Sequence, residues 1–221
     1  MNTRLIIGSL LLSASSALFA QTPGAPDGKG GVGIAYYDRI KGNLMTASKT
    51  GGAWATQLID GQDAMGNDTG DVGIGTSLFI DDSGDWHITY VNGFTEGLQY
   101  VKLVKGAAPP AMVETVDDGL GVGGTPFDDG QHLVGDDSHV HVLSGGEVHV
   151  TYQDATSGTL HYAVGAPGAN GHTWTVKSIQ QTGFAGAFSN IVVVNGQLQL
   201  VNWWRVGGME VKGDVRVVQA K

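Results

Sequence analysis

The sequence of 221 residues contains no cysteine, and only 15 % of its residues are charged. Without cysteine the chain has neither disulfides nor thiolate metal ligands, so its stability depends on a hydrophobic core, which a chain of this length is able to bury. Basic residues are scarce, with 12 lysines and arginines against 21 aspartates and glutamates. This balance argues against nucleic acid and anionic membranes as partners, because both require clustered positive charge.

Glycine, in contrast, is abundant, with 36 residues in the chain. The usual share is about 7 %, and each glycine inside a helix costs up to ~1 kcal/mol relative to alanine, so helical bundles are excluded. Collagen is excluded because the glycines have no three-residue period. The hydrophobic content of 41 % is too high for a disordered chain. The composition therefore predicts an all-β protein that is rich in turns.

The first twenty residues have the layout of a signal peptide. Arg4 precedes an apolar run over residues 5–12, and small residues lead to a cleavage site after Ala20. The apolar run is too short for a membrane anchor, and no other segment approaches membrane length. We therefore expect a secreted or periplasmic protein without membrane insertion. Residues 1–20 form the signal peptide, 21–30 a flexible segment and 31–221 the folded domain.

An internal repeat organises this domain. Its copies cover about residues 31–60, 77–117, 138–180 and 189–221, and three sets of residues align. These are Ser77, Ser138 and Ser189; Leu44, Leu98 and Leu160; and Tyr37, Tyr90 and Tyr152 with the following Asp38, Asn92 and Asp154. Alternating apolar residues and Gly, Asn or Asp turns predict four short strands per copy. The first copy is expected to lack its first strand, and the last copy its fourth.

Four antiparallel strands that recur about every 50 residues are typical of a β-propeller blade. A β-sandwich would give no reason for the repeat. The sequence therefore predicts a small, all-β propeller of about four four-stranded antiparallel blades. Such a ring is either incompletely closed or completed by homo-oligomerisation, because unpaired strand edges invite pairing.

Three segments carry a family resemblance: SLFIDDSGDWHITYVN (77–92), HVTYQDATSGTLHYAVG (149–165) and GIAYYDRIKGNLMTAS (33–48). They resemble the repeats of secreted bacterial propellers of the sialidase-like, Asp-box (BNR-like) superfamily, and their rhythm is similar to that of propeller lectins. The resemblance implies that residues 82–86 close a turn and are not catalytic. It also implies an arginine triad for sialidase chemistry, but Arg39, Arg205 and Arg216 lie in unrelated repeat positions.

Aromatic residues near the ends of the second strands, with polar neighbours, suit the stacking and hydrogen bonding of sugars. The predicted ligand-binding residues are Tyr37, Asp38, Tyr90, Asn92, Tyr152, Asp154, Trp203 and Trp204. Alternatively, each tyrosine packs between blades and its hydroxyl reaches a turn. Trp203 and Trp204 are adjacent, so they must point to opposite faces of their sheet.

Histidines suggest a metal site in the third copy. A turn at residues 144–146 would place His139, His141 and His149 on one sheet face, and pairing of Thr151 with His161 would add a fourth imidazole. Imidazoles bind zinc or copper, which makes His139, His141, His149 and His161 predicted ligands. The alternative is that these histidines fill packing positions between blades.

Two long acidic loops, residues 61–76 and 118–137, offer oxygen ligands for calcium. Their carboxylates are those of Asp63, Asp68, Asp71, Asp118, Asp128, Asp129, Asp136 and Asp137. The alternative is a solvated acidic rim.

The function predicted from these patterns is an exported binding module for a glycan or another surface polymer. We predict no catalytic residue, and a G-x-S-x-G nucleophile motif is absent. Two alternatives stay open. One is a metal-dependent enzyme that uses the histidines, and the other is an assembly module that pairs through open blade edges.

Overall fold

The computed structural model describes residues 24–27, 30–107, 112–121, 123–179, 183–206 and 212–220. The predicted signal peptide lies outside these ranges, and so do residues 21–23, 28 and 29 of the predicted flexible segment. Within these ranges there is no α-helix, and hence no helix that is long and apolar enough to cross a bilayer.

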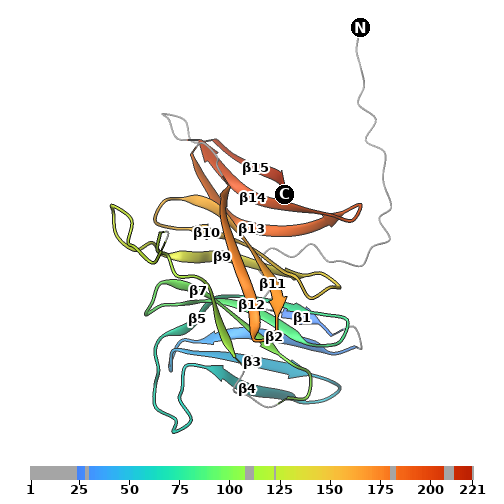
Figure 1. Ribbon diagram of the computed structural model, residues 1–221. Helices are drawn as coiled ribbons and strands as arrows, with labels where there is room; N and C mark the ends of the chain where they lie inside the picture. Colours follow the sequence, from blue (N-terminus) through green and yellow to red (C-terminus); the bar gives the residue numbers. More distant parts are fainter. Residues whose placement is uncertain are drawn as a thin grey trace.

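The described strands form four antiparallel sheets, each following the chain order (Figure 1). Sheet 1 contains β1 (Gly24–Pro26), β2 (Val32–Asp38), β3 (Asn43–Lys49) and β4 (Trp54–Asp60). Sheet 2 contains β5 (Val72–Ile80), β6 (Trp86–Asn92), β7 (Gly97–Leu103) and β8 (Val113–Asp117). Sheet 3 contains β9 (Val134–Val142), β10 (Val148–Asp154), β11 (Thr159–Gly168) and β12 (Gly171–Ile179). Sheet 4 contains β13 (Phe184–Val194), β14 (Gln197–Val206) and β15 (Lys212–Gln219).

The predicted four-blade, all-β architecture is confirmed, with one correction at the start of the chain. The first sheet does have a first strand, β1, which lies before residue 31 and pairs with β2 from Gly24 opposite Ile34. Its sequence, Gly-Ala-Pro, has no apolar alternation, so the pattern gave no sign of it. Sheet 4 has three strands in the described ranges, as expected.

The four sheets stack in sequence order, from sheet 1 in blue to sheet 4 in red (Figure 1). In the described part of the chain, all substantial contacts between sheets join consecutive ones: β5 contacts sheet 1, β9 contacts β5 and β6, and β13 contacts β9 and β10. Sheets 2 and 3 are therefore covered on both faces. Sheets 1 and 4 each have one outer face at an end of the stack.

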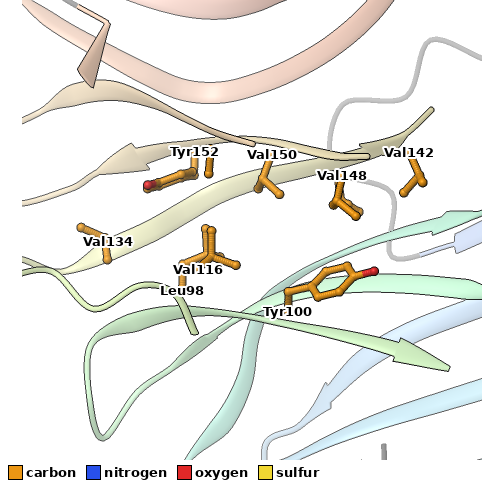
Figure 2. Close-up of a cluster of buried hydrophobic side chains, with 10 residues drawn as sticks. Leu98, Tyr100, Val116, Val134, Val142, Val148, Val150 and Tyr152 are labelled. Atoms are coloured by element: carbon orange, nitrogen blue, oxygen red, sulfur yellow. The ribbon is translucent and has the colours of Figure 1, made fainter. Parts of the chain in front are cut away.

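The main core lies between sheets 2 and 3 (Figure 2). There Leu98, Tyr100 and Val116 face Val148 and Val150 across the gap between the two sheets. Alternate residues of a strand point to opposite faces, so the odd-even pattern of β10 directs one set of side chains toward sheet 2 and the other toward sheet 4. The apolar alternation in the sequence thus encodes contacts between blades.

The repeated serines lie on the first strands of their sheets and form hydrogen bonds to neighbouring sheets. Ser77 Oγ accepts a hydrogen bond from the Val140 amide at 3.2 Å, and Ser138 Oγ lies 3.0 Å from Thr89 Oγ1. Ser189 Oγ donates to the carbonyl of Asp137 at 2.8 Å. All three serines are buried, so they satisfy backbone and hydroxyl groups that water cannot reach.

The repeated leucines require glycines in the next sheet. Gly73 and Gly135 have φ angles of 102° and 99°, a region that side chains disfavour. A Cβ atom would lie 2.9 Å from Leu44 Cα at Gly73, and 2.9 Å from Leu98 Cβ at Gly135. Gly186 has the same conformation beside Leu160. Each glycine lets its first strand bend closely over the sheet before it.

Buried tyrosines form a further bridge between sheets. The Tyr90 hydroxyl donates to Asp60 at 2.6 Å, and the Tyr152 hydroxyl donates to Asp117 at 2.6 Å. Both tyrosines are 0 % exposed, and each aspartate ends the fourth strand of the preceding sheet. We call this arrangement the Tyr–Asp bridge.

The structure corrects the alignment of the first copy. Asp38 and Asp154 both end a second strand, pairing with Asn43 and Thr159, so they are equivalent. The residue two positions before Asp154 is Tyr152, and the residue two positions before Asp38 is Tyr36, not Tyr37. Tyr37 therefore points to the opposite face of its sheet.

The contact between sheets 3 and 4, the third junction between consecutive sheets, has no Tyr–Asp bridge. Ile179 pairs with Leu160 as Asp117 pairs with Leu98, so an isoleucine stands in the aspartate position. Asn202 stands in the tyrosine position of sheet 4. Its Oδ1 accepts a hydrogen bond from the Gly186 amide at 3.1 Å, whereas its buried Nδ2 has no partner among the described residues. Both members of the bridge are thus replaced together.

Candidate functional site

The connections between strands gather on two sides of the stack, which are distinct from the outer faces of sheets 1 and 4. One, the loop end, carries the long connections 61–71 and 118–133 and the turns 39–42, 93–96 and 155–158. The other, the turn end, carries the turns 81–85 and 143–147 and the β7–β8 and β11–β12 connections. The sequence predicted function at the loop end.

Several of the predicted calcium ligands at the loop end stabilise their own turns. Asp63 accepts hydrogen bonds from the amides of Met65 and Asn67, at 2.8 and 2.9 Å, and Asp118 accepts one from Leu120 at 3.0 Å. Over the described ranges, no group of three or more His, Cys, Asp or Glu side chains is arranged to hold a metal ion. Calcium binding remains a prediction from the sequence, without an assembled ligand set in this part of the chain.

The predicted histidine register is confirmed for one hairpin and wrong for the next. His141 pairs with His149 and Val140 with Val150, as the turn at residues 144–146 requires. His161, however, pairs with Tyr152, not with Thr151. Because a shift of one residue reverses the face, His161 points toward sheet 2, away from His149.

The other three histidines have separate neighbours. His139 Nδ1 accepts a hydrogen bond from the Ile191 amide at 3.3 Å, and the His141 ring packs edge-on against Phe79, with centroids 4.9 Å apart. His149 Nδ1 lies 2.6 Å from the Tyr162 hydroxyl. Burial lowers the pKa of all three, that of His139 to about 4. These neutral imidazoles fill positions between strands, and zinc or copper binding remains a prediction.

Several predicted ligand-binding residues serve the fold. Tyr90 and Tyr152 are completely buried, so neither ring is able to stack on a ligand at the surface. Asp38 and Asn92 accept hydrogen bonds from the amides two residues ahead, each at 3.0 Å, and thereby shape their turns. Asp154 is buried as well. Burial argues against ring stacking by Tyr90 and Tyr152 and favours the alternative that these tyrosines pack between blades. A ligand-binding role for Asp38, Asn92 and Asp154 remains a prediction.

Tyr37 and the two tryptophans remain accessible. The Tyr37 hydroxyl donates to Asp71 at the loop end. Trp203 and Trp204 point to opposite faces of sheet 4, as predicted, since they pair with Val215 and Asp214 in turn. Both indoles are partly buried, and that of Trp203 lies on the outer face of the stack.

A buried polar network fixes the long loop 118–133. His132 lies with Nδ1 2.6 Å from Asp154 and Nε2 3.0 Å from Asp129. His161 lies between Asp117 and Asp154, at 3.5 and 4.0 Å. Burial lowers the pKa of His132, but hydrogen bonds to the two aspartates outweigh this and raise it overall. This network connects the loop to sheets 2 and 3. No pattern in the sequence indicated a role for His132, because its buried partner Asp154 lies in β10, 22 residues away.

A cleft lies at the turn end, between sheets 2 and 3. This cleft has a volume of about 690 Å³. Its polar and aromatic lining comes from several strands and turns: Phe79, Asp81, Asp82, Ser83, His87, Lys102, Glu114, Ser144 and His172. A cleft of this size with a few convergent polar groups is typical of a binding site.

Glu114 on β8 is held rigidly in one wall of the cleft. Its carboxylate accepts hydrogen bonds from Trp174 Nε1 at 2.9 Å and from the His172 amide at 3.1 Å. His172 Nδ1 also lies 3.1 Å from it. These three groups come from β12, so the wall is shared by sheets 2 and 3.

Asp81 and His87 form a second polar group in the lining. Asp81 accepts a hydrogen bond from the Asp85 amide at 2.9 Å, and its other oxygen lies 3.1 Å from His87 Nε2. His87 Nδ1 lies 2.7 Å from the Tyr100 hydroxyl. Burial lowers the pKa of His87, so its ring is neutral at pH 7. Lys102 reaches the same region and pairs with Asp85 at 2.9 Å.

Of the residues that line this cleft, the sequence patterns drew attention only to those in the turns at 82–86 and 144–146. Glu114 and His172 belong to different copies of the repeat, and neither has a motif around it. Their association follows from the packing of β8 on β12, which no local pattern encodes.

A third region lies on the innermost strands at the loop end. Asp137 and Phe188 have φ angles of 51° and 50°, and the Phe188 amide donates to Asp137 at 2.9 Å. Phe188 is 63 % exposed. Desolvation and the charge of Asp137 raise the pKa of Asp136. Backbone strain beside a perturbed carboxyl group is a feature of functional sites.

No protein-family model matches the sequence, and no curated protein is significantly similar to it. Solved structures are similar in fold. A GH43 β-1,3-galactosidase has a TM-score of 0.50 at 11 % identity, over 87 % of this chain and 43 % of its own. An exo-β-1,3-galactanase from Phanerochaete chrysosporium with β-1,3-galactotriose has a TM-score of 0.46 at 12 % identity, over 86 % and 47 %. A GH43 β-xylosidase/α-arabinofuranosidase from a compost metagenome with xylotriose has a TM-score of 0.45 at 15 % identity, over 88 % and 67 %.

The chain spans less than half the length of the two galactan-active proteins. At such low identity the similarity concerns the fold alone, and the sialidase-like family suggested by the repeats remains a prediction. What the comparison with the β-1,3-galactosidase establishes is that this chain has a β-propeller fold of the kind found in glycosidases.

Proposed function

We propose that this protein is an exported β-propeller that binds a glycan in the cleft between sheets 2 and 3. The observation that carries the proposal is the cleft itself, which combines an aromatic ring, Phe79, with carboxylates that are already oriented by other hydrogen bonds. Sugars present hydroxyl groups and C–H faces, and fixed acceptors beside an aromatic ring suit both. The ligands of the two oligosaccharide-bound neighbours, β-1,3-galactotriose and xylotriose, are the first probes to test.

Binding is favoured over catalysis because Asp81 and Glu114 are each fixed by two or more donors. A glycosidase needs one carboxylic acid to give up its proton and a second carboxylate to act as nucleophile or base. Burial raises the pKa of Asp81, but its hydrogen bonds with His87 and the Asp85 amide outweigh burial and lower the pKa overall, which suits an acceptor better than an acid.

The test is isothermal titration of the secreted protein with β-1,3-galactotriose and xylotriose. Lys102→Ala removes a charged donor from the cleft and should weaken binding about 10-fold or more, the effect of losing a hydrogen bond to a charged group. Lys41→Ala, at an exposed turn of the loop end, is the matched control and should bind normally. Equal binding by both variants would exclude the cleft.

A second candidate is glycan hydrolysis on the innermost strands, favoured by the raised pKa of Asp136. Chromatography of each oligosaccharide after incubation separates the two functions. A binding protein leaves the trisaccharide intact. Release of smaller sugars that is lost in Asp136→Asn and retained in Lys102→Ala would replace the binding proposal with hydrolysis.

A further inference from the structure

The outer face of sheet 4 is apolar although it lies at an end of the stack. In β14, Leu200 points toward sheet 3, so its neighbour Val201 points outward. Val201 pairs with Val217, which is 59 % exposed. Trp203 and Val192 lie on the same face. In a monomer this surface would leave several branched side chains and part of an indole in water.

The outer face of sheet 1 is apolar as well. In β2, Ala35 packs toward sheet 2, so Ile34 and Tyr36 point outward. Tyr36 pairs with Met45, which pairs with Leu58 on the next strand. These apolar side chains continue across three strands of the sheet.

The two outer faces are the two halves of a contact that already occurs three times in the chain. Ile34 and Tyr36 occupy the positions of Val150 and Tyr152, which the preceding sheet buries completely. The outer face of sheet 4 is the one that, in sheets 1, 2 and 3, covers the following sheet. The outer face of sheet 1 is therefore of the kind that packs on the outer face of sheet 4.

We propose that sheet 4 of one copy packs on sheet 1 of a second copy, as consecutive sheets pack within the chain. The contact joins two different faces, so it is heterologous, and the smallest assembly that covers every end face is a closed dimer. Among the described side chains, two cations at the rims of these faces lie beside aromatic rings. Lys49 lies 5.9 Å from the Trp54 ring centroid, and Arg205 lies 5.5 Å from that of Phe184.

Light scattering coupled to size exclusion tests the proposal on the secreted protein over a range of concentrations. We expect a mass of at least two chains. Val217→Lys on sheet 4 and Ile34→Lys on sheet 1 should each lower it toward that of a monomer. Ile40→Lys is the control, because Ile40 is 95 % exposed in a turn away from both faces, and its mass should equal that of the unaltered protein.

Mixing the two interface variants distinguishes this contact from others. The Val217→Lys chain keeps an intact sheet 1 face and the Ile34→Lys chain an intact sheet 4 face, so the mixture should form dimers that neither variant forms alone. This recovery also shows that both variants are folded. A monomeric unaltered protein, or variants that fail to recover on mixing while their β spectra are unchanged, would overturn the proposal.

Discussion

At the residue scale, stability depends on polar side chains that are buried between sheets. The Tyr–Asp bridges place a carboxylate where water is scarce, and Asp117 has hydrogen bonds from Tyr152 and the Gly119 amide. A buried carboxylate that loses a donor keeps the cost of its desolvation. Removing one donor of a buried carboxylate should therefore destabilise the fold although few atoms are lost.

Removing one hydroxyl tests this view. Tyr152→Phe leaves Asp117 without its 2.6 Å partner and should cost about 1–3 kcal/mol of unfolding free energy. For a chain of this size the melting temperature should then fall by roughly 2–4 °C per kcal/mol. Thermal unfolding at pH 7 measures the change. Tyr37→Phe, at the surface, should melt like the parent, and equal losses in both would contradict the argument.

The buried histidines make stability depend on pH. Burial lowers the pKa of His139 to about 4, so the folded state holds it neutral while the unfolded chain protonates near pH 6.5. The unfolded state binds more protons in this range, and stability is therefore lost as the pH falls from about 6.5 to 4. His139 alone should lower the free energy of unfolding by ~3 kcal/mol over this pH range.

Denaturant unfolding at pH 7, 6, 5 and 4 tests this dependence. His139→Asn keeps an acceptor for the Ile191 amide but does not titrate, so its stability should fall less steeply with acid. His132, whose pKa is raised, acts in the opposite sense, and its contribution is lost as the pH rises above its folded pKa. Parallel curves for the parent and His139→Asn would refute the assignment.

At the element scale, the sequence predicted the repeat correctly, but it predicted the pairing register of the strands only in part. Alternation placed Val148 and Val150 on one face correctly, because both faces of sheet 3 are packed and their residue types differ. The pairing of Thr151 with His161 failed because the turn at residues 155–158 makes Asp154 pair with Thr159. Glycine and polar residues surround that turn, so the sequence did not show where the strands end.

The glycines of the innermost strands give a prediction at this scale. Gly135→Ala combines a positive φ with a Cβ 2.9 Å from Leu98, and strain and overpacking together should cost ~2–5 kcal/mol. Gly51→Ala also has a positive φ but meets nothing within 4 Å, so it should cost only ~1–2 kcal/mol. Denaturant titration compares the two. A loss at Gly135 no larger than at Gly51 would mean that the first strands do not need this close approach.

At the scale of the whole molecule, the fold class was predictable and the cleft was not. Composition and repeat length were sufficient for an all-β propeller. The cleft needs β8 and β12 side by side, which depends on how sheet 2 packs on sheet 3. Packing between repeats is a property of three-dimensional contacts, and no single copy contains it.

The open stack predicts uneven hydrogen exchange. In the Val217→Lys variant, amides of β6 and β10, covered on both faces, should exchange more slowly than those of β2 and β14. In the unaltered protein, protection of β2 and β14 should increase with protein concentration, because the second copy covers them. Mass spectrometry of deuterated peptides reads both effects. Uniform protection across all four sheets of the Val217→Lys variant would exclude an open stack.

The paired replacement of Tyr and Asp by Asn202 and Ile179 has a mechanical consequence. If the chain were stretched from its two ends, the load would pass through three junctions in series, and two of them carry a Tyr–Asp bridge. The third relies on backbone-directed bonds such as Ser189 to Asp137 and Gln153 to Ala185. In a force spectrometer the first rupture should therefore release sheet 4, leaving sheets 1 to 3 as the unit that resists longest.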